Sequence, residues 1–499
     1  MGMALKRGII IVFGLCAQIC LYLFVYLFFI NHVPVLHIFV DGLALLLALW
    51  LIKNSKNYSY TLPWLVIILL VPIVGALLYF ILGYNKKNSK TLKSITKSEA
   101  KSKRYLVQNE KTKHEFRHNS KLRYITNYSG YPVTRNNDVV YYPLGEEAFE
   151  AMLKELKKAK KFIFIEYFII DHGKMWNSIL EVLKEKVGEG VEVRVMYDDL
   201  GSITTLDESY PKKLGKYGIK CIPFNHLNAV AGVIMNNRDH RKIMVIDGKV
   251  AFSGGINIAD EYINAIKRFG HWKDNGIKVS GDAVWSYTVM FLTIWNAFSE
   301  DDDDFTKYKY EFKNKQENKS YVAPYGESPL DLEGTGEDVY LNIINQANKY
   351  VYIFTPYLII DTDMINALSL CAKRGVDVRI VIPGVPDKKL VYTVSESYVE
   401  PLVKAGVKVY RYTPGFIHSK VFVSDDHIAT VGTINMDYRS LYLHFECGCY
   451  IENHPVVKDV KKDALETLEK SHEITKQEAK SALSKEVWQA FLRLLAPLM

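Results

Sequence analysis

The sequence predicts an α/β protein made of two repeated α/β/α sandwich lobes, preceded by N-terminal transmembrane helices. Three observations support this fold class. Apolar residues concentrate in the first 83 positions, strand-like and helix-like segments then alternate twice in the same order, and each half ends in the same polar motif. The 499 residues are enough for two to four domains. An apolar fraction of 49% is low for a polytopic transporter, and a net charge of +8 indicates no particular partner.

Three apolar stretches open the chain, at 8–30, 33–52 and 60–82. Each approaches the roughly twenty residues that a helix needs to cross a bilayer. A cleaved signal peptide would explain only the first stretch, and no small-residue cleavage site follows it. We therefore expect residues 1–83 to form a membrane anchor of two or three helices. The second stretch contains His37 and Asp41, so a tight hairpin and a single span with an interfacial helix are both open.

A basic segment follows the last apolar stretch. Its basic residues are Lys86, Lys87, Lys90, Lys93, Lys97, Lys101, Lys103 and Arg104. The positive-inside rule places this linker, predicted at 84–139, and the catalytic domain on the cytoplasmic side of the cell membrane. Lys6 and Arg7 favour an inward N-terminus too, which conflicts with three full spans. The lysines either attract anionic headgroups, at about 1 kcal/mol per charge, or only set the topology of a solvated linker.

The two lobes are predicted from an internal repeat. Matching strand-like segments lie in the same order in both halves, at 161–171 and 350–361, at 190–195 and 375–380, and at 218–222 and 406–410. Their apolar runs are continuous, as in strands covered on both faces by helices. The first lobe is expected at 140–298 and the second at 330–470.

The segment at 299–329 is polar and is predicted to be an inter-lobe loop. Its four aspartates at 301–304 are more typical of a solvated loop than of a metal site, because successive loop residues rarely converge on one ion. The six cysteines show neither zinc-ligand spacing nor a disulfide framework. We predict no metal and no cofactor.

Each half ends in a polar motif with the spacing H-x-K-x4-D and an asparagine seventeen residues after the histidine. The motif residues are His240, Lys242, Asp247 and Asn257 in the first half, and His418, Lys420, Asp425 and Asn435 in the second. One such motif alone would be weak evidence. Two copies with equal spacing, each closing an equivalent repeat, strongly favour a functional site.

The motif chemistry suits a phosphodiester. Histidine and lysine two positions apart on a strand share one face, and the lysine supplies a positive charge beside the asparagine amide. Gly-rich turns let backbone N–H groups approach an anion. Two copies meeting at a pseudo-twofold axis would surround one phosphate, so that one imidazole could attack phosphorus while the other protonates the leaving alkoxide.

The doubled motif, with its trailing G-G/T-x-N, resembles the phospholipase D superfamily over about residues 140–470. The resemblance implies a two-lobed fold and a covalent phosphohistidine intermediate. It also implies that Asp247 and Asp425 support the site, and that Asp274 and Glu446 brace the catalytic histidines. His444 departs from the pattern, because many relatives have asparagine two positions before the bracing glutamate.

Further segments are similar to bacterial cardiolipin synthases; they lie at 60–85, 165–168, 254–262, 435–440 and 471–498. This resemblance implies transfer of a phosphatidyl group between two phosphatidylglycerol molecules, which yields cardiolipin and glycerol without nucleotide or metal. His240 is then assigned as nucleophile and His418 as acid/base, although the two halves are too symmetric to decide. The implied partners are phosphatidylglycerol and cardiolipin in an anionic bilayer; the oligomeric state is open.

The tail at 471–499 is predicted to be an amphipathic helical segment. Trp488, Phe491, Leu492 and Leu495 form one apolar stripe at helical spacing. Such a stripe more often docks on the protein's own body, and lying in the lipid interface is the alternative.

The main rival function is a membrane-anchored phospholipase D hydrolase that uses the same residues with water as acceptor. A nuclease is less favoured, since it has no need of three apolar spans and no nucleic-acid-binding motif stands out. A non-enzymatic lipid-binding scaffold would not need both His-Lys pairs.

Overall fold

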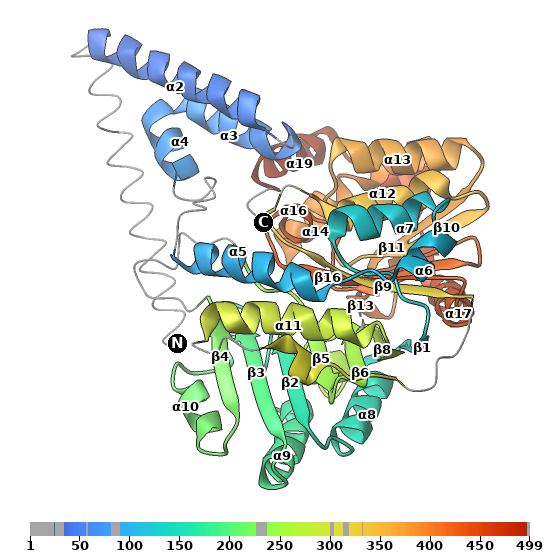
Figure 1. The fold of residues 1–499 in the computed structure, drawn as a ribbon. Helices are drawn as coiled ribbons and strands as arrows, with labels where there is room; N and C mark the ends of the chain where they lie inside the picture. The colour runs from blue at the N-terminus through green and yellow to red at the C-terminus, as the bar shows by residue number, and fades with distance from the viewer. Residues whose placement is uncertain are drawn as a thin grey trace. The chain divides into compact units, whose positions relative to one another are not determined.

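The computed structural model describes residues 24, 34–55, 58–80, 90–225, 237–299, 304–312, 319–331 and 333–496 (Figure 1). The chain divides into two compact units. The first consists of 1–86, 228–236 and 493–499, and the second of 87–227 and 237–492. All residues of the doubled motif belong to the second unit.

The described helices of the first unit are α2 (Pro34–Asn54), α3 (Tyr58–Leu70) and α4 (Pro72–Leu78). They share a small core of buried side chains, formed by Ala44, Leu51, Trp64, Ile68 and Tyr79. The stretch at 60–82, predicted as one helix, is interrupted at Val71, because Pro72 has no N–H to continue the helical bonding.

The transmembrane prediction is not confirmed. Across the described part of the chain, no helix meets both the length and the apolarity needed for a membrane span. The predicted first span at 8–30 lies outside the described residues except for Phe24. The multi-pass anchor therefore stays a prediction.

The first lobe of the second unit contains, within the described residues, a seven-stranded sheet in the order β1-β8-β6-β5-β2-β3-β4. Its strands are β1 (Asn137–Tyr142), β2 (Phe162–Tyr167), β3 (Glu192–Asp198), β4 (Lys220–Phe224), β5 (Lys242–Ile246), β6 (Val250–Gly254) and β8 (Gly276–Gly281). Helices cover both faces (Figure 1): α8 (Gly145–Leu156), α9 (Lys174–Gly188) and α10 (Tyr210–Gly215) lie on one face and α11 (Val284–Phe298) on the other. This covering explains the continuous apolar strand runs.

The second lobe repeats this sheet with one added strand. In the described residues its order is β17-β12-β11-β10-β14-β15-β16-β9. The strands are β9 (Tyr321–Glu327), β10 (Tyr350–Phe354), β11 (Asp377–Pro383), β12 (Lys408–Tyr412), β14 (Val421–Ser424), β15 (Ile428–Gly432), β16 (Glu446–Glu452) and β17 (Ser471–Glu473). Read from β9 to β12, this order matches that from β1 to β4, strand for strand. The predicted duplication is therefore confirmed.

The second lobe also contains helices, which alternate with its strands along the chain as in the first lobe. They are α12 (Thr335–Gln346), α13 (Thr362–Lys373), α14 (Lys389–Glu396), α15 (Val399–Ala405), α16 (Tyr438–Tyr442) and α17 (Val456–Glu469).

Two predicted segment boundaries are wrong. The segment at 299–329 is not wholly a loop, since it contains a short 3-10 helix at Phe305–Tyr308 and strand β9. Pro324 weakens the strand signal of β9, but an edge strand tolerates proline. Among the described strands β9 lies at the sheet edge beside β16, and its Val322 also forms an isolated bridge with Thr134. The predicted tail begins with β17, which pairs with β12, before α18 (Lys476–Ala479) and α19 (Leu483–Leu495).

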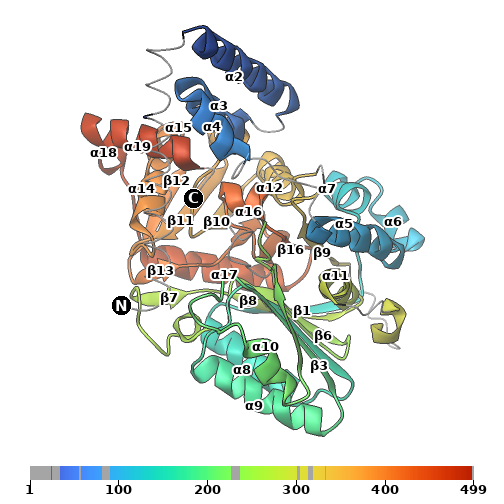
Figure 2. The ribbon, with the colours of Figure 1, turned by 90° about the vertical axis from the view of Figure 1, so that its left-hand side faces the viewer.

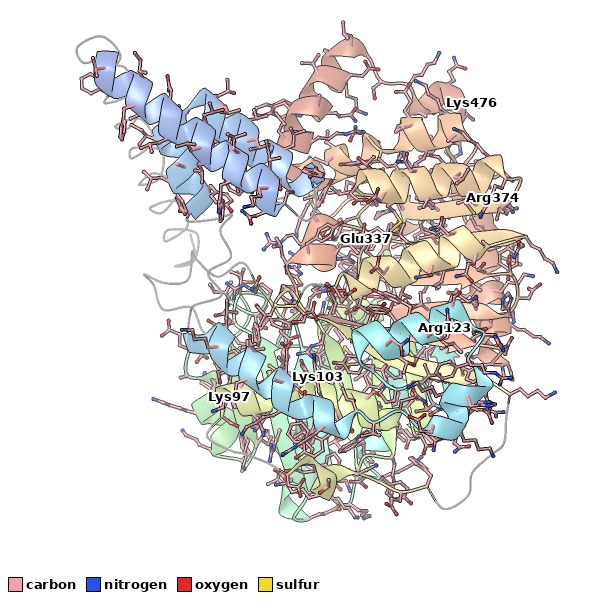
Figure 3. All side chains as sticks on the ribbon, turned by 45° about the horizontal axis from the view of Figure 1, so that its top comes forward. Lys97, Lys103, Arg123, Glu337, Arg374 and Lys476 are labelled. Atoms are coloured by element: carbon pink, nitrogen blue, oxygen red, sulfur yellow. The ribbon has the colours of Figure 1, made fainter. Side chains whose placement is uncertain are left out.

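The described part of the predicted linker, residues 90–139, is folded. Helix α5 (Lys90–Ser102) packs along α11, where the Ser98 hydroxyl donates to the Thr293 carbonyl at 2.6 Å. Lys97 of α5 is exposed, and so is Lys103 directly after the helix (Figure 3). Small buried serines let the two helices approach closely, so this segment is part of the catalytic unit.

Helices α6 (Glu110–Glu115) and α7 (Ser120–Tyr124) carry the same segment onto the second lobe. There the Tyr124 hydroxyl donates to Asp338 at 2.5 Å. The segment therefore contacts both lobes.

The two lobes are joined by backbone pairing. Strand β7 (His271–Lys273) of the first lobe pairs in parallel with β13 (Gly415–Ile417) of the second (Figure 2). Phe416 on β13 is part of the first lobe's hydrophobic core, and the buried Lys273 amine contacts Asp463 of α17 at 2.7 Å. Because residues of each lobe pack against the other, these contacts fix the position of one lobe relative to the other.

Candidate active site

The two motif histidines lie at the lobe interface. The His240 amide donates to the Phe445 carbonyl at 2.9 Å, and the His418 amide donates to the Lys273 carbonyl at 2.7 Å. Each histidine is thus tied by its backbone to the opposite lobe. Both side chains are buried. His240 lies two residues before β5 and His418 three residues before β14, so neither histidine is on the strand where the motif predicted it.

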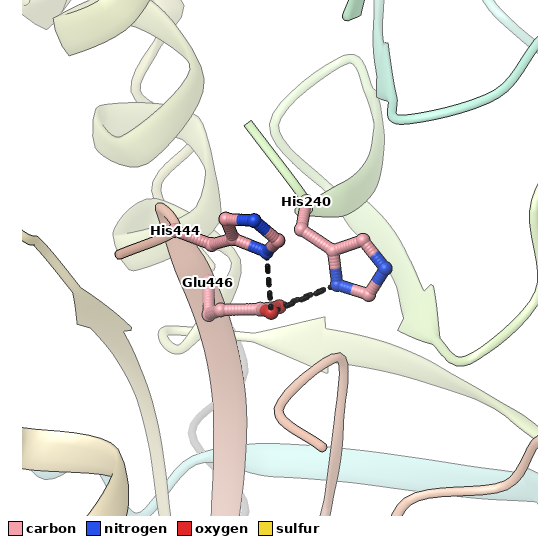
Figure 4. Close-up of side chains that lie close together, drawn as sticks. All are labelled: His240, His444 and Glu446. Atoms are coloured by element: carbon pink, nitrogen blue, oxygen red, sulfur yellow. Dashed lines mark hydrogen bonds and ion pairs between the residues drawn. The ribbon is translucent and has the colours of Figure 1, made fainter. Parts of the chain in front are cut away.

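A carboxylate from the opposite lobe braces each imidazole. His240 Nδ1 lies 2.8 and 2.9 Å from the two carboxylate oxygens of Glu446 (Figure 4). His418 Nδ1 lies 2.7 Å from Asp274 Oδ2. A carboxylate at Nδ1 orients the ring and leaves Nε2 for chemistry. The structure brings both predicted bracing residues to the histidines and adds that each contact crosses between lobes.

Burial sets the ionisation of these pairs. It lowers the pKa of His418 to about 4, with the Lys420 charge adding to the effect, and it holds the pKa of His240 well below its ordinary value. Burial raises the pKa of Glu446. Burial also acts to raise the pKa of Asp274, but His418 and Lys420 outweigh it and the net pKa is lowered. The imidazoles are therefore neutral near pH 7, as a nucleophile requires.

The motif lysines complete the charged centre. Lys242 Nζ donates to the His240 carbonyl at 2.7 Å, and Lys420 Nζ lies 2.9 Å from His418 Nδ1. Burial lowers the pKa of Lys242 to about 8 and that of Lys420 to about 7. Because an anion between the lysines would favour their charged forms, the site is prepared for a phosphate.

The two motif asparagines differ in their side-chain hydrogen bonds. The Asn257 side chain accepts from the Ile169 amide at 3.1 Å and donates to the Tyr262 hydroxyl at 2.7 Å. The buried Asn435 Oδ1 has no hydrogen-bond partner among the described residues. Phosphate binding by both asparagines stays a prediction; the geometry shows that Asn257 also positions its own loop.

Asp247 and Asp425 do not contact the motif histidines, and each binds backbone amides of a neighbouring segment instead. Strand β5 separates Asp247 from His240, and its carboxylate accepts from the backbone amides of residues 160–162. Asp425 accepts in the same way from residues 348–350. Both adopt a left-handed backbone with φ of 53°. Equal spacing therefore reflects a shared turn that closes the sheet, not shared chemistry.

Replacing Asp247 or Asp425 with alanine is expected to weaken folding rather than chemistry. Each variant leaves three backbone donors without their acceptor and places alanine at positive φ, which together cost about 2 kcal/mol or more. Urea unfolding in detergent measures the loss. The asparagine variants, which keep an acceptor oxygen and tolerate this φ, should lose less. Reduced turnover at unchanged stability would contradict the structural role.

Several aromatic residues around the histidines escaped the sequence analysis. The Phe168 ring lies 4.9 Å from that of His240, and the Tyr262 and Trp272 rings lie 5.4 and 5.6 Å from that of His418. Trp272 precedes Asp274 by two positions, as His444 precedes Glu446. This shared spacing is the sequence signal that could have identified Trp272. The residue two positions before the bracing carboxylate differs between the half-sites, so their histidines have different neighbours.

The donor set does not fit a resident metal well. Within the described residues, His240, His444 and Glu446 place their ligand atoms within 4.8 Å of one another (Figure 4). However, the main charge influences on the two imidazoles come from cations, including Lys242 and Arg439. Repulsion from fixed cations in a buried site opposes a divalent ion. The geometry is better suited to an anion.

Comparison with known proteins agrees with this geometry. Residues 152–268 and 340–467 match the family model described as "Cardiolipin synthase, PLD-like domain", and residues 42–83 match "Phospholipase_D-nuclease N-terminal". The chain is 34% identical over 459 residues to a cardiolipin synthase of Clostridium perfringens, covering 89% of this chain and 95% of that protein. It is 31% identical over 498 residues to cardiolipin synthase 1 of Staphylococcus aureus, with coverage of 92% and 96%.

Among solved structures, the phosphatidylserine synthase of Haemophilus influenzae superposes with a TM-score of 0.57 at 15% identity. The match covers 76% of this chain and 98% of that one and supports the fold. Two lobes that each contribute a histidine, a lysine and a bracing carboxylate to one centre define a phospholipase D-type enzyme. Within that superfamily, the chain belongs to the cardiolipin synthase family.

Proposed function

We propose that the protein is a membrane-associated cardiolipin synthase that transfers a phosphatidyl group from one phosphatidylglycerol to another and releases glycerol. The observation that carries this proposal is the pair of buried imidazoles, each braced at Nδ1 by a carboxylate of the opposite lobe. One imidazole can attack phosphorus while the other donates and then accepts a proton, as a double-displacement reaction requires. Family membership selects the lipid substrates.

In the first half-reaction, His240 Nε2 attacks the phosphorus of the donor lipid. The N–P bond forms as the P–O bond to glycerol breaks. His418 enters this step as the imidazolium, which the bound phosphodiester favours, gives its Nε2 proton to the departing glycerol oxygen and becomes neutral. Lys242 and Lys420 offset the charge that develops on the phosphoryl oxygens. The products are a phosphatidyl-histidine and free glycerol.

In the second half-reaction, a hydroxyl of another phosphatidylglycerol gives its proton to His418 and attacks the same phosphorus. The new P–O bond forms as the N–P bond breaks, which restores both histidines and yields cardiolipin. One phosphodiester replaces another, so the exchange needs no energy source.

The choice of His240 as nucleophile is supported by Glu446. Both of its carboxylate oxygens face His240 Nδ1, at 2.8 and 2.9 Å, which suits a ring that becomes positively charged when its Nε2 carries phosphorus. At His418, the Lys420 amine shares the space around Nδ1 with Asp274. A neighbouring cation disfavours a lasting positive ring.

The proposal is tested with purified protein in phosphatidylglycerol liposomes without added metal, followed by lipid mass spectrometry. Cardiolipin and glycerol in equal amounts are expected. Phosphatidic acid as the dominant product would instead establish a hydrolase with water as acceptor.

A further inference from the structure

Transfer to a second lipid requires a binding position that hydrolysis does not require. When the acceptor phosphatidylglycerol attacks, the site holds two phosphodiesters at once: the one bound to His240 and the acceptor's own. This reasoning rests on the proposed synthase function. A second anion-binding position should therefore lie one glycerol unit from the reacting phosphorus, roughly 6 Å for a three-carbon spacer with bonds of about 1.5 Å.

The side chains next to His240 match this demand. Arg439 Nε donates to His444 Nε2 at 3.3 Å, which places the ring hydrogen of a neutral His444 on Nδ1. That Nδ1 is buried without a hydrogen-bond partner in the described structure and lies 3.9 Å from the nearer Glu446 oxygen (Figure 4). The ring centroids of His444 and His240 are 5.7 Å apart. A buried donor thus lies directly beside the ring of the proposed nucleophile.

The charges around His444 are mainly positive. After burial, the largest influences that lower its pKa are the charges of Arg439, Arg238, Lys242 and Lys388. Lys388 is exposed just before α14.

Three acidic groups also lie nearby, and each has a local role. Asp437 accepts from the Ser440 amide and burial raises its pKa. Asp387 accepts from the Tyr357 hydroxyl, and Glu446 holds His240. These contacts leave the cationic character of the position in place.

The equivalent position in the other half-site has no such character. Trp272 occupies the position in that half-site that is equivalent to His444, two residues before the bracing carboxylate. The Tyr262 ring packs between Trp272 and Asn257. The pseudo-twofold symmetry of the motifs is therefore broken on the side of His240. The Trp272 indole Nε1 is also buried without a hydrogen-bond partner among the described residues, but on the side of His240 the ring at this position contacts an arginine.

We propose that Arg439, the Nδ1–H of His444 and Lys388 form a subsite for the phosphodiester of the acceptor lipid. The subsite places an acceptor hydroxyl next to phosphatidyl-His240 and favours an anionic lipid over water or a neutral alcohol. This subsite explains how a fold that could also support hydrolysis transfers the phosphatidyl group of phosphatidyl-His240 to a lipid instead of water.

An acceptor competition tests the subsite. Mixed micelles contain equal amounts of phosphatidylglycerol and monoacylglycerol, which offer glycerol hydroxyls with and without a phosphate. Cardiolipin and acylated phosphatidylglycerol, the two transfer products, are counted by mass spectrometry. Their ratio cancels any general loss of activity, because both products arise from the same intermediate.

We expect Arg439→Gln and Lys388→Gln to lower the ratio of cardiolipin to the neutral-acceptor product about tenfold, the effect of losing a charged hydrogen bond. The neighbouring exposed Lys389 provides the matched control, and Lys389→Gln should keep the wild-type ratio. His444→Leu should lower the ratio, and His444→Asn, which retains a donor, should restore most of it.

An unchanged ratio in both cation variants would overturn the subsite, whatever their total activity. Failure of the proposed function is distinguishable, since the wild-type protein would then make no cardiolipin in the same micelles.

Discussion

Cardiolipin formation is expected to fall at least about a thousandfold when either His240 or His418 is replaced with alanine. Without His240 no phosphatidyl-enzyme can form. Without His418 the glycerol oxygen leaves unprotonated and the acceptor hydroxyl keeps its proton. Initial rates from lipid mass spectrometry measure both losses.

The second lobe offers a matched control in His427, which contacts the Asp425 carbonyl away from the site. His427→Ala should retain most activity. A tenth or more of wild-type activity in either motif variant would show that the two imidazoles do not act as a pair.

The second large effect concerns the carboxylates that cross between lobes. Asp274→Asn and Glu446→Gln are each expected to lower turnover about a hundredfold or more, with little change in the unfolding midpoint. An amide can donate to Nδ1 and thereby stabilise the wrong imidazole tautomer, although it nearly matches the carboxylate in size. Rates at saturating phosphatidylglycerol check this.

The pH profile separates this positioning role from a packing role. Asp274 raises the pKa of His418 against burial and Lys420. His418 must be protonated to act as the acid of the first half-reaction, so replacing Asp274 should shift the basic limb, where His418 loses its proton, to lower pH. A profile that keeps its wild-type shape while stability falls would contradict the account.

The duplicated fold could be predicted because each lobe repeats the same buried strands. Continuous apolar runs identify strands covered on both faces, and their repetition at three matched positions in each half predicted the duplication. Strand β9 was missed because Pro324 and Gly326 interrupt its pattern, and β17 because three residues carry no periodicity. Their strand state depends on pairing with β16 and β12, which is tertiary information.

The candidate site was predictable in its residue types but not in its pairing. The resemblance to the phospholipase D superfamily implies that Glu446 and Asp274 brace the histidines. The sequence alone does not tell that each braces the histidine of the other lobe, since that depends on the β7–β13 contact. Equal spacing also drew Asp247 and Asp425 into the site, although both cap a turn. The apolar stripe of the tail is divided as well: Leu492 is buried, whereas Trp488 and Phe491 are exposed.

The central claim is that His240 carries the phosphatidyl group between two half-reactions, and direct trapping tests it. The protein is mixed with phosphatidylglycerol and quenched in alkaline denaturant, which preserves a phosphorus–nitrogen bond, and its peptides are sequenced by mass spectrometry. The account predicts a phosphatidyl adduct on His240 that disappears in His240→Ala. An adduct on His418, or cardiolipin formation with no adduct on any residue, would contradict it.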